Sequence, residues 1–150
     1  MNAPPPRHTT STGARAEAVA AAYLTRHGLQ IIARNAIAGG VEIDLIARKH
    51  GAADDGGDAL PTFVFIEVRS RRDDTRGHPL ETVGAHKRRR QVKGATAWLV
   101  AQGLWERVHV RFDVVSVVGA LEEISPGAGA AQPSRSPSIQ WLANAFEAHT

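Results

Sequence analysis

Cysteine is absent from this chain of 150 residues, which excludes disulfide bonds and thiolate chemistry and is consistent with a reducing compartment. No apolar run approaches the ~20 residues that a transmembrane helix requires. The short apolar stretch 18–24 follows directly after Glu17, so we expect no secretory signal and a cytoplasmic protein without membrane contact. The seven histidines lack the spacing of zinc ligands, and no glycine-rich phosphate-binding loop is present.

The composition, with 43% apolar and 22% charged residues, is typical of a globular protein, and the length suits one domain. We expect a disordered N-terminal tail over residues 1–11 and a flexible linker over residues 119–138, since both are poor in large apolar residues. Residues 139–150 predict a short C-terminal helix. Residues 12–118 predict an α/β domain in the order α-β-β-β-α-β, with helices at 12–27 and 82–102 and strands at 29–35, 41–48, 62–69 and 107–118.

Two of these strands place carboxylates inside apolar runs. Burial of an ionised carboxylate is costly without a partner, so each acid needs a divalent cation or an ion pair. Strict alternation along the second strand puts Glu42, Asp44 and Ile46 on one face. If the second and third strands pair as a hairpin, Asp44 and Glu67 lie side by side, with Arg69 two positions further on.

Such a pair of acids predicts a site for magnesium or manganese. The expected ligands are Asp44, Glu67, the backbone carbonyl of Val68 and water, with Glu42 assisting. Such an ion activates water for hydrolysis of a phosphodiester, and the neighbouring Arg69 would stabilise the developing negative charge. Glu17 borders the apolar side of the first helix and could reach the site from above the sheet.

Positive charge is concentrated in one segment of the chain. Residues 69–93 hold nine of the eighteen Lys and Arg against three acids. This excess predicts a polyanionic partner, first of all a nucleic acid, although a solvated helix face is the alternative. The residues expected to contact the phosphate backbone are Arg71, Arg72, Lys87, Arg88, Arg89, Arg90 and Lys93.

Over residues 13–118 the sequence resembles the YraN family of small bacterial proteins. The resemblance depends on Ala-Glu at 16–17, Glu-Ile-Asp-Leu-Ile at 42–46, Phe-Ile-Glu-Val-Arg-Ser-Arg at 65–71, Lys87, and Arg-Phe-Asp-Val at 111–114. It implies the restriction-endonuclease-like fold of the PD-(D/E)xK superfamily, near Holliday-junction resolvases: a mixed sheet flanked by helices. A magnesium-dependent endonuclease acting on DNA is implied, with a homodimer as one assembly.

The same resemblance implies roles for individual residues. Asp44 corresponds to the motif aspartate, Glu67 to the second acid and Glu17 to the helix glutamate of the resolvase-like branch. The chain departs from the family pattern at Val41, where glycine is usual, and at Arg69, where the motif has lysine. Arginine can grip a phosphate but cannot lose a proton to act as a base.

Because of this departure, two alternatives stay open. The protein could be a catalytically inactive nucleic-acid-binding module, or a protein–protein adaptor whose basic helix meets an acidic partner. Lys87 could compensate for the missing motif lysine. A purely structural alternative pairs Asp44 and Glu67 with Arg69 and Arg48. Arg111 and Asp113 share a strand face and predict an ion pair with each other.

Overall fold

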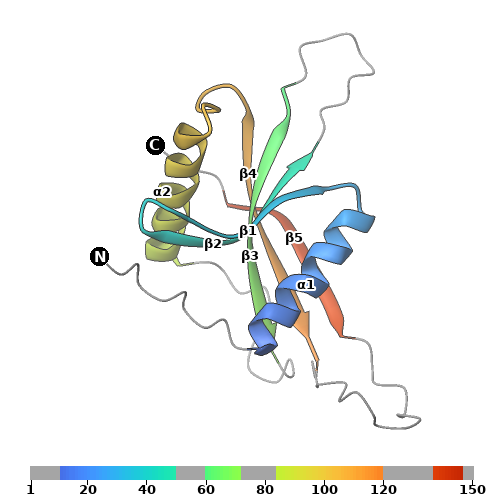
Figure 1. Ribbon diagram of the computed structural model, residues 1–150. Helices are drawn as coiled ribbons and strands as arrows, with labels where there is room; N and C mark the ends of the chain where they lie inside the picture. The colour runs from blue at the N-terminus through green and yellow to red at the C-terminus, as the bar shows by residue number, and fades with distance from the viewer. Residues whose placement is uncertain (1–10, 50–59, 72–83, 120–136, 147–150) are drawn as a thin grey trace, which may run out of the picture.

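A five-stranded sheet forms the centre of the protein and carries one helix on each face (Figure 1). The computed structural model describes residues 11–49, 60–71, 84–119 and 137–146. The strands lie side by side in chain order, and all neighbours are antiparallel except β3 and β4. The elements are α1 (Ser11–Arg26), β1 (Gln30–Ala38), β2 (Val41–Lys49), β3 (Thr62–Arg71), α2 (Ala85–Ala101), β4 (His109–Val118) and β5 (Ser138–Phe146). The predicted α/β fold class, a mixed sheet flanked by helices, is confirmed.

Glycines end both helices, as the sequence predicts. Gly28 follows α1 with a φ of 92° and Gly103 follows α2 with a φ of 70°, a region that favours a residue without a Cβ. The parallel pair β3 and β4 requires a long crossover, and α2 lies within it. The tail residues 1–10, the linker residues 120–136 and the expected helix start at 82–83 lie outside the described residues.

The prediction of a short C-terminal helix within 139–150 is wrong. Ser138–Phe146 is strand β5, which pairs antiparallel with β4, while residues 147–150 lie outside the described ranges. Ile139 and Trp141 are half-buried and pack on the core at the α1 face, while Ser138 and Leu142 beside them are exposed. A short apolar segment can satisfy a helix or a strand pattern, and here the free edge of β4 supplies backbone partners that a separate helix would lack.

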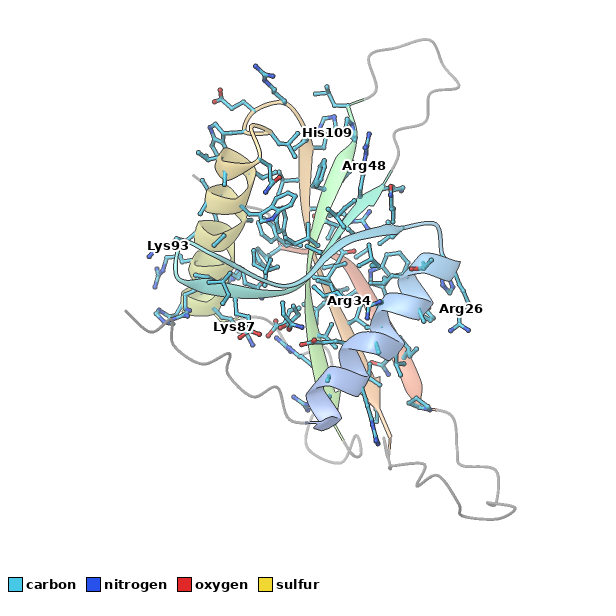
Figure 2. The ribbon with its side chains drawn as sticks, in the orientation of Figure 1. Arg26, Arg34, Arg48, Lys87, Lys93 and His109 are labelled. Atoms are coloured by element: carbon cyan, nitrogen blue, oxygen red, sulfur yellow. The ribbon has the colours of Figure 1, made fainter. Side chains whose placement is uncertain are left out.

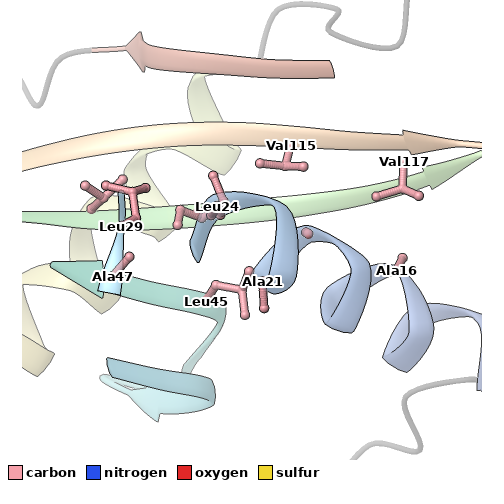
Figure 3. Packing of buried hydrophobic residues seen from close by; sticks show 11 residues of the cluster. Ala16, Ala21, Leu24, Leu29, Leu45, Ala47, Val115 and Val117 are labelled. Atoms are coloured by element: carbon pink, nitrogen blue, oxygen red, sulfur yellow. The ribbon is translucent and has the colours of Figure 1, made fainter. Parts of the chain in front are cut away.

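Two apolar cores lie on opposite faces of the sheet. The core under α1 contains small alanines of the helix, which let it pack close to the strands (Figure 3). Its buried members include Ala16, Ala20, Ala21, Leu24, Leu45, Ala47, Val115 and Val117. The core under α2 is richer in aromatic residues and includes Ile43, Ile46, Phe63, Phe65, Leu99, Phe112 and Phe146. Together the two cores hold both helices against the central strands.

The β1–β2 hairpin does not alternate regularly, so the expectation that Glu42, Asp44 and Ile46 share a face is wrong. Ile43 and Ile46 both contribute to the core under α2, although three positions separate them. The change of face occurs at Asp44, opposite Asn35, whose φ of 51° is left-handed. The hairpin therefore turns at this point, and its tip lies against α2 (Figure 1).

The contact between the hairpin and α2 depends on glycine. A Cβ at Gly94 would lie 3.0 Å from Val41 Cβ, and a Cβ at Gly39 would lie 3.1 Å from Ala97 Cβ. Both distances are tighter than ordinary side-chain packing allows. Val41, which stands where the resembling family usually has glycine, is thus accommodated by the missing side chain at Gly94 on the helix.

Candidate acidic site between α1, the hairpin and β3

Asp44 reaches across to β3 at the point where β2 and β3 separate. The last pair of their ladder is Leu45 with Ile66. Beyond it, the backbone N–H of Val68 donates a hydrogen bond of 2.9 Å to Asp44 Oδ2. The carboxylate therefore takes a place that a backbone acceptor fills elsewhere in the sheet, and it is held beside Glu67.

Four acidic side chains share the electrostatic field of this site. Burial is the largest cause that raises the pKa of Asp44, from an ordinary 3.8 to about 6. The hydrogen bond from Val68 opposes this rise, whereas the negative charges of Glu17, Glu67 and Glu42 add to it. Among the described residues no Lys or Arg forms an ion pair with Asp44. The structure thus brings together all the acids that the sequence singled out.

Glu17 enters the site from α1. Its side chain faces the sheet and is 8% exposed. Burial raises the pKa of Glu17, a side-chain hydrogen bond with Asn35 lowers it, the charge of Glu42 raises it and that of Arg34 lowers it. The expected approach of Glu17 from above the sheet is therefore observed, and a neutral amide is its hydrogen-bond partner.

Asn35 is the site residue that sequence reasoning missed. The sequence predicts that the first strand ends at Asn35, whereas β1 continues to Ala38 with Asn35 in the left-handed region. A signal was available, since asparagine adopts positive φ more readily than most residues. Without the pairing of β1 with β2, however, nothing in the sequence placed Asn35 opposite Asp44.

Glu67 is buried and surrounded by cations. Its Oε1 contacts Lys87 Nζ from the start of α2, and its Oε2 lies 3.4 Å from Arg69 Nη2. Figure 2 shows Lys87 at the lower end of α2, with Arg48 at the other end of the sheet. The structural alternative is therefore correct in pairing Glu67 with Arg69. It is wrong for Arg48, which lies opposite Phe63 and whose buried Nε has no hydrogen-bond partner among the described residues.

The donor chemistry of the site suits a hard divalent cation. No three Asp, Glu or His side chains of the described ranges form a ready ligand cluster. Magnesium, however, is commonly bound by one or two carboxylates and several waters. Asp44 and Glu67 supply the carboxylates, and Val68, which follows Glu67 directly in the chain and whose N–H donates to Asp44, supplies a backbone carbonyl. The residues present fit such an ion, with Glu42 and Glu17 adding negative charge nearby.

Five basic residues lie on α2, and the first of them, Lys87, contacts Glu67. Lys87, Arg89, Arg90 and Lys93 are exposed, while Arg88 is half-buried with no hydrogen-bond partner for its Nε in the described part of the chain. We call these five residues the α2 basic row. Lys87 belongs both to this row and to the acidic site. Arg71 is half-buried at the end of β3, and Arg72 lies outside the described residues.

Asp113 is a fully buried acid outside this site, on β4, and it has a full set of partners. Arg111 donates two hydrogen bonds to its carboxylate, at 2.9 and 2.8 Å, which confirms the predicted pair. Trp141 Nε1 donates a third at 2.8 Å and the backbone N–H of Asn144 a fourth at 2.9 Å. Asp113 therefore joins β4 to β5 and has no oxygen left for another role.

The sequence of this chain is similar to those of known proteins. Residues 16–117 match the model of the family described as "Uncharacterised protein family UPF0102". A UPF0102 protein of Chromohalobacter salexigens is 40% identical over 136 residues, covering 91% of this chain and 90% of the relative. A UPF0102 protein of Geobacter sulfurreducens is 39% identical over 140 residues, covering 93% and 91%. Neither α1 nor α2, the helices of the described residues, has the length and apolar character of a transmembrane span.

Proposed function

This chain belongs to the UPF0102 family, the family of the YraN proteins that its motifs resemble, and we propose its function from the geometry of the acidic site. The protein binds nucleic acid and hydrolyses phosphodiester bonds in DNA with the help of magnesium or manganese. The observation that carries this proposal is the state of Asp44: a half-buried carboxylate beside three other acids, with one N–H donor and no cation from the described residues.

That arrangement is unfavourable in the protein alone. Burial and like charge both oppose ionisation of Asp44, yet at neutral pH the carboxylate is largely charged because its pKa is about 6. A divalent cation would reverse the sign of the local field and convert the destabilising charges into ligands. Acidic groups held together at such an energetic cost are typical of functional sites.

Each residue then has a defined part. Asp44, Glu67 and the carbonyl of Val68 would hold the ion, which supplies an activated water and a Lewis acid for phosphodiester hydrolysis. Arg69 and Lys87 both contact Glu67, so their positive charges lie beside the place where a phosphate would bind. They would stabilise the charge that develops on the phosphate, and neither needs to lose its proton for that purpose.

The α2 basic row would bind the DNA backbone and position it beside the acids. Its members lie between positions 87 and 93 of α2, and Lys87 connects them with the acids through its contact with Glu67. Phosphate contacts of this kind are independent of sequence and weaken with salt. If all five residues contact phosphates of duplex DNA, the slope of log K against log salt is about −4 to −5.

Titration of manganese into the protein, followed by calorimetry at pH 7.5, tests the ion. We expect uptake by the native chain and a loss of at least tenfold in affinity for Asp44→Asn. Glu106→Gln is the matched control, because Glu106 is an exposed acid of the α2–β4 loop. No uptake, or equal uptake by Asp44→Asn and the native chain, would contradict the metal site.

The inactive binding module is favoured by one observation, namely that two cations already neutralise Glu67. Plasmid and four-way-junction DNA incubated with manganese separate the two functions: the nuclease cleaves, whereas the module retains DNA on a gel at low salt without cleavage. An adaptor protein would show neither. Arg69→Lys restores the motif lysine, and a rise in cleavage would show that arginine slows an otherwise intact site.

A further inference from the structure

Asn35 occupies a position in β1 that few residues would tolerate. Its φ is 51° in the middle of a nine-residue strand, where an extended conformation is usual. The flanking pairs Arg34 with Leu45 and Ala36 with Ile43 place it directly opposite Asp44. The unusual backbone thus lies next to the central acid of the site.

The left-handed residue coincides with the change of face in both strands. On β1, Ala33 and Ala36 pack toward the same core under α2, although they are three positions apart. On β2, Ile43 and Ile46 do the same. A regular hairpin would put each pair on opposite faces. The turn at Asn35 and Asp44 is therefore what allows the carboxylate of Asp44 to reach the N–H of Val68 instead of facing a core.

The side chain of Asn35 acts in a second way. It forms a hydrogen bond with the buried carboxylate of Glu17 on α1. No other described side chain forms a hydrogen bond with Glu17, and the positive charge that lowers its pKa is that of Arg34. The amide thereby ties α1 to the hairpin and fixes one acid next to another, an arrangement that mutual repulsion opposes.

We propose that Asn35 is a positioning residue of the acidic site, which turns the hairpin through its backbone and holds Glu17 beside Asp44 through its amide. This inference rests on the proposed function, since the acids are held together for a cation. Asn35 itself touches no substrate. It acts through Glu17, whose charge strengthens the attraction of the site for a divalent ion.

A double-mutant cycle with manganese calorimetry separates the two roles of Asn35, that of its backbone and that of its amide. Asn35→Gly keeps the left-handed backbone available and removes only the amide. We expect it to melt within about 4 °C of the native chain and to lose about tenfold in manganese affinity. In a Glu17→Gln background, the same substitution should cause no further loss, because the carboxylate that Asn35 holds has been replaced.

Asn144→Gly is the matched control. Asn144 also has a left-handed φ, 54°, and also lies inside a strand, but its backbone N–H serves Asp113 and not the acidic site. It should leave manganese affinity unchanged. Asn35→Ala tests the role of the backbone, since alanine tolerates this left-handed φ less well than asparagine does. It should lower the melting temperature by about 2–8 °C.

The outcomes distinguish this inference from the function on which it rests. If the native chain takes up no manganese, the proposed function fails and the inference with it. If the native chain takes up manganese and Asn35→Gly binds it equally well, only the positioning role is overturned. An equal loss in the native and Glu17→Gln backgrounds would also overturn it, because Asn35 would then act independently of Glu17.

Discussion

Asp113 and Asp44 are both aspartates of central strands, the first fully buried and the second half-buried, and their surroundings are opposite. Asp113 is fully buried and accepts four hydrogen bonds, two of them from a guanidinium. Asp44 accepts one hydrogen bond and is repelled by the negative charges of three other carboxylates. A buried acid whose oxygens are all satisfied holds the fold together, whereas an acid surrounded by like charge is typical of functional sites.

The two regions also differ in how they are built. Asp113 joins β4 to β5, and its donors come from neighbouring positions of the same sheet. The acidic site gathers side chains from α1, β2 and β3, and its counter-charge from α2. Loss of the first region should therefore affect stability, and loss of the second should affect ion and DNA binding. The predictions below test this division, beginning with the largest expected effect.

Asp113→Ala should be the most destabilising of these changes. It leaves the charge of Arg111, the indole N–H of Trp141 and the N–H of Asn144 without their acceptor. Breaking a buried ion pair in this way costs about 3–5 kcal/mol of the free energy of unfolding. Urea denaturation followed by circular dichroism measures it. A loss below about 1 kcal/mol would show that water replaces the aspartate easily and that the comparison is wrong.

Asp44→Asn should have the opposite sign at neutral pH. The folded-state pKa of Asp44, about 6, lies above the ordinary 3.8, so the folded protein keeps this proton where the unfolded chain loses it. Stability from this group is therefore present at low pH and is lost as pH rises from about 4 to about 6. At pH 7.5 the uncharged variant should be more stable by roughly 2–3 kcal/mol, and below pH 4 the difference should vanish.

Thermal unfolding across that pH range measures the effect, with Glu106→Gln as the exposed control. Manganese should raise the melting temperature of the native chain at pH 7.5 but not that of Asp44→Asn, since a ligand stabilises only the state that binds it. If Asp44→Asn is instead less stable than the native chain both at pH 7.5 and at pH 4, the carboxylate is a structural acid like Asp113.

Trp141→Phe should weaken the Asp113 region by a smaller amount. The change keeps an aromatic ring but removes the N–H that donates to Asp113 at 2.8 Å. One hydrogen bond to a charged acceptor is worth about 1.5–3 kcal/mol, and three donors to Asp113 remain, so we expect a loss of about 1–2 kcal/mol. Manganese uptake should not change. A fall in uptake with intact stability would connect the two regions that we separate.

Lys87→Met should change stability least. The pair with Glu67 involves a half-exposed lysine, and such pairs contribute about 0–1 kcal/mol. DNA binding should weaken, and the slope of log K against log salt should become smaller by about 1. Arg26→Gln is the control, because Arg26 lies on α1, on the other side of the molecule from α2 (Figure 2). Equal slopes for both variants would remove Lys87 from the DNA surface.

Much of this organisation could be predicted from local pattern. Glycines at 28 and 103 predict the helix ends, and the acids at 44 and 67 predict a shared site because each interrupts an apolar strand. The predictions were wrong where the conformation or the pairing of a residue depends on a partner from another part of the chain. The segment of β5 carries a pattern compatible with a helix, and only the free edge of β4 makes it a strand. Arg48 has the charge expected of a partner for Asp44 but lies opposite Phe63 instead.

The sequence by itself determined which charged side chains are the candidates for the proposed site, because composition and alternation along a strand are local properties. It determined the two acids of neighbouring strands, the basic helix and the Arg111–Asp113 pair. Only the tertiary structure decided that Lys87 neutralises Glu67 while Asp44 is left among acids, and that Asn35 turns the hairpin between them. The reason is physical: the energy of a charge away from water depends on every group within a few ångströms, and those groups come from five elements, α1, β1, β2, β3 and α2.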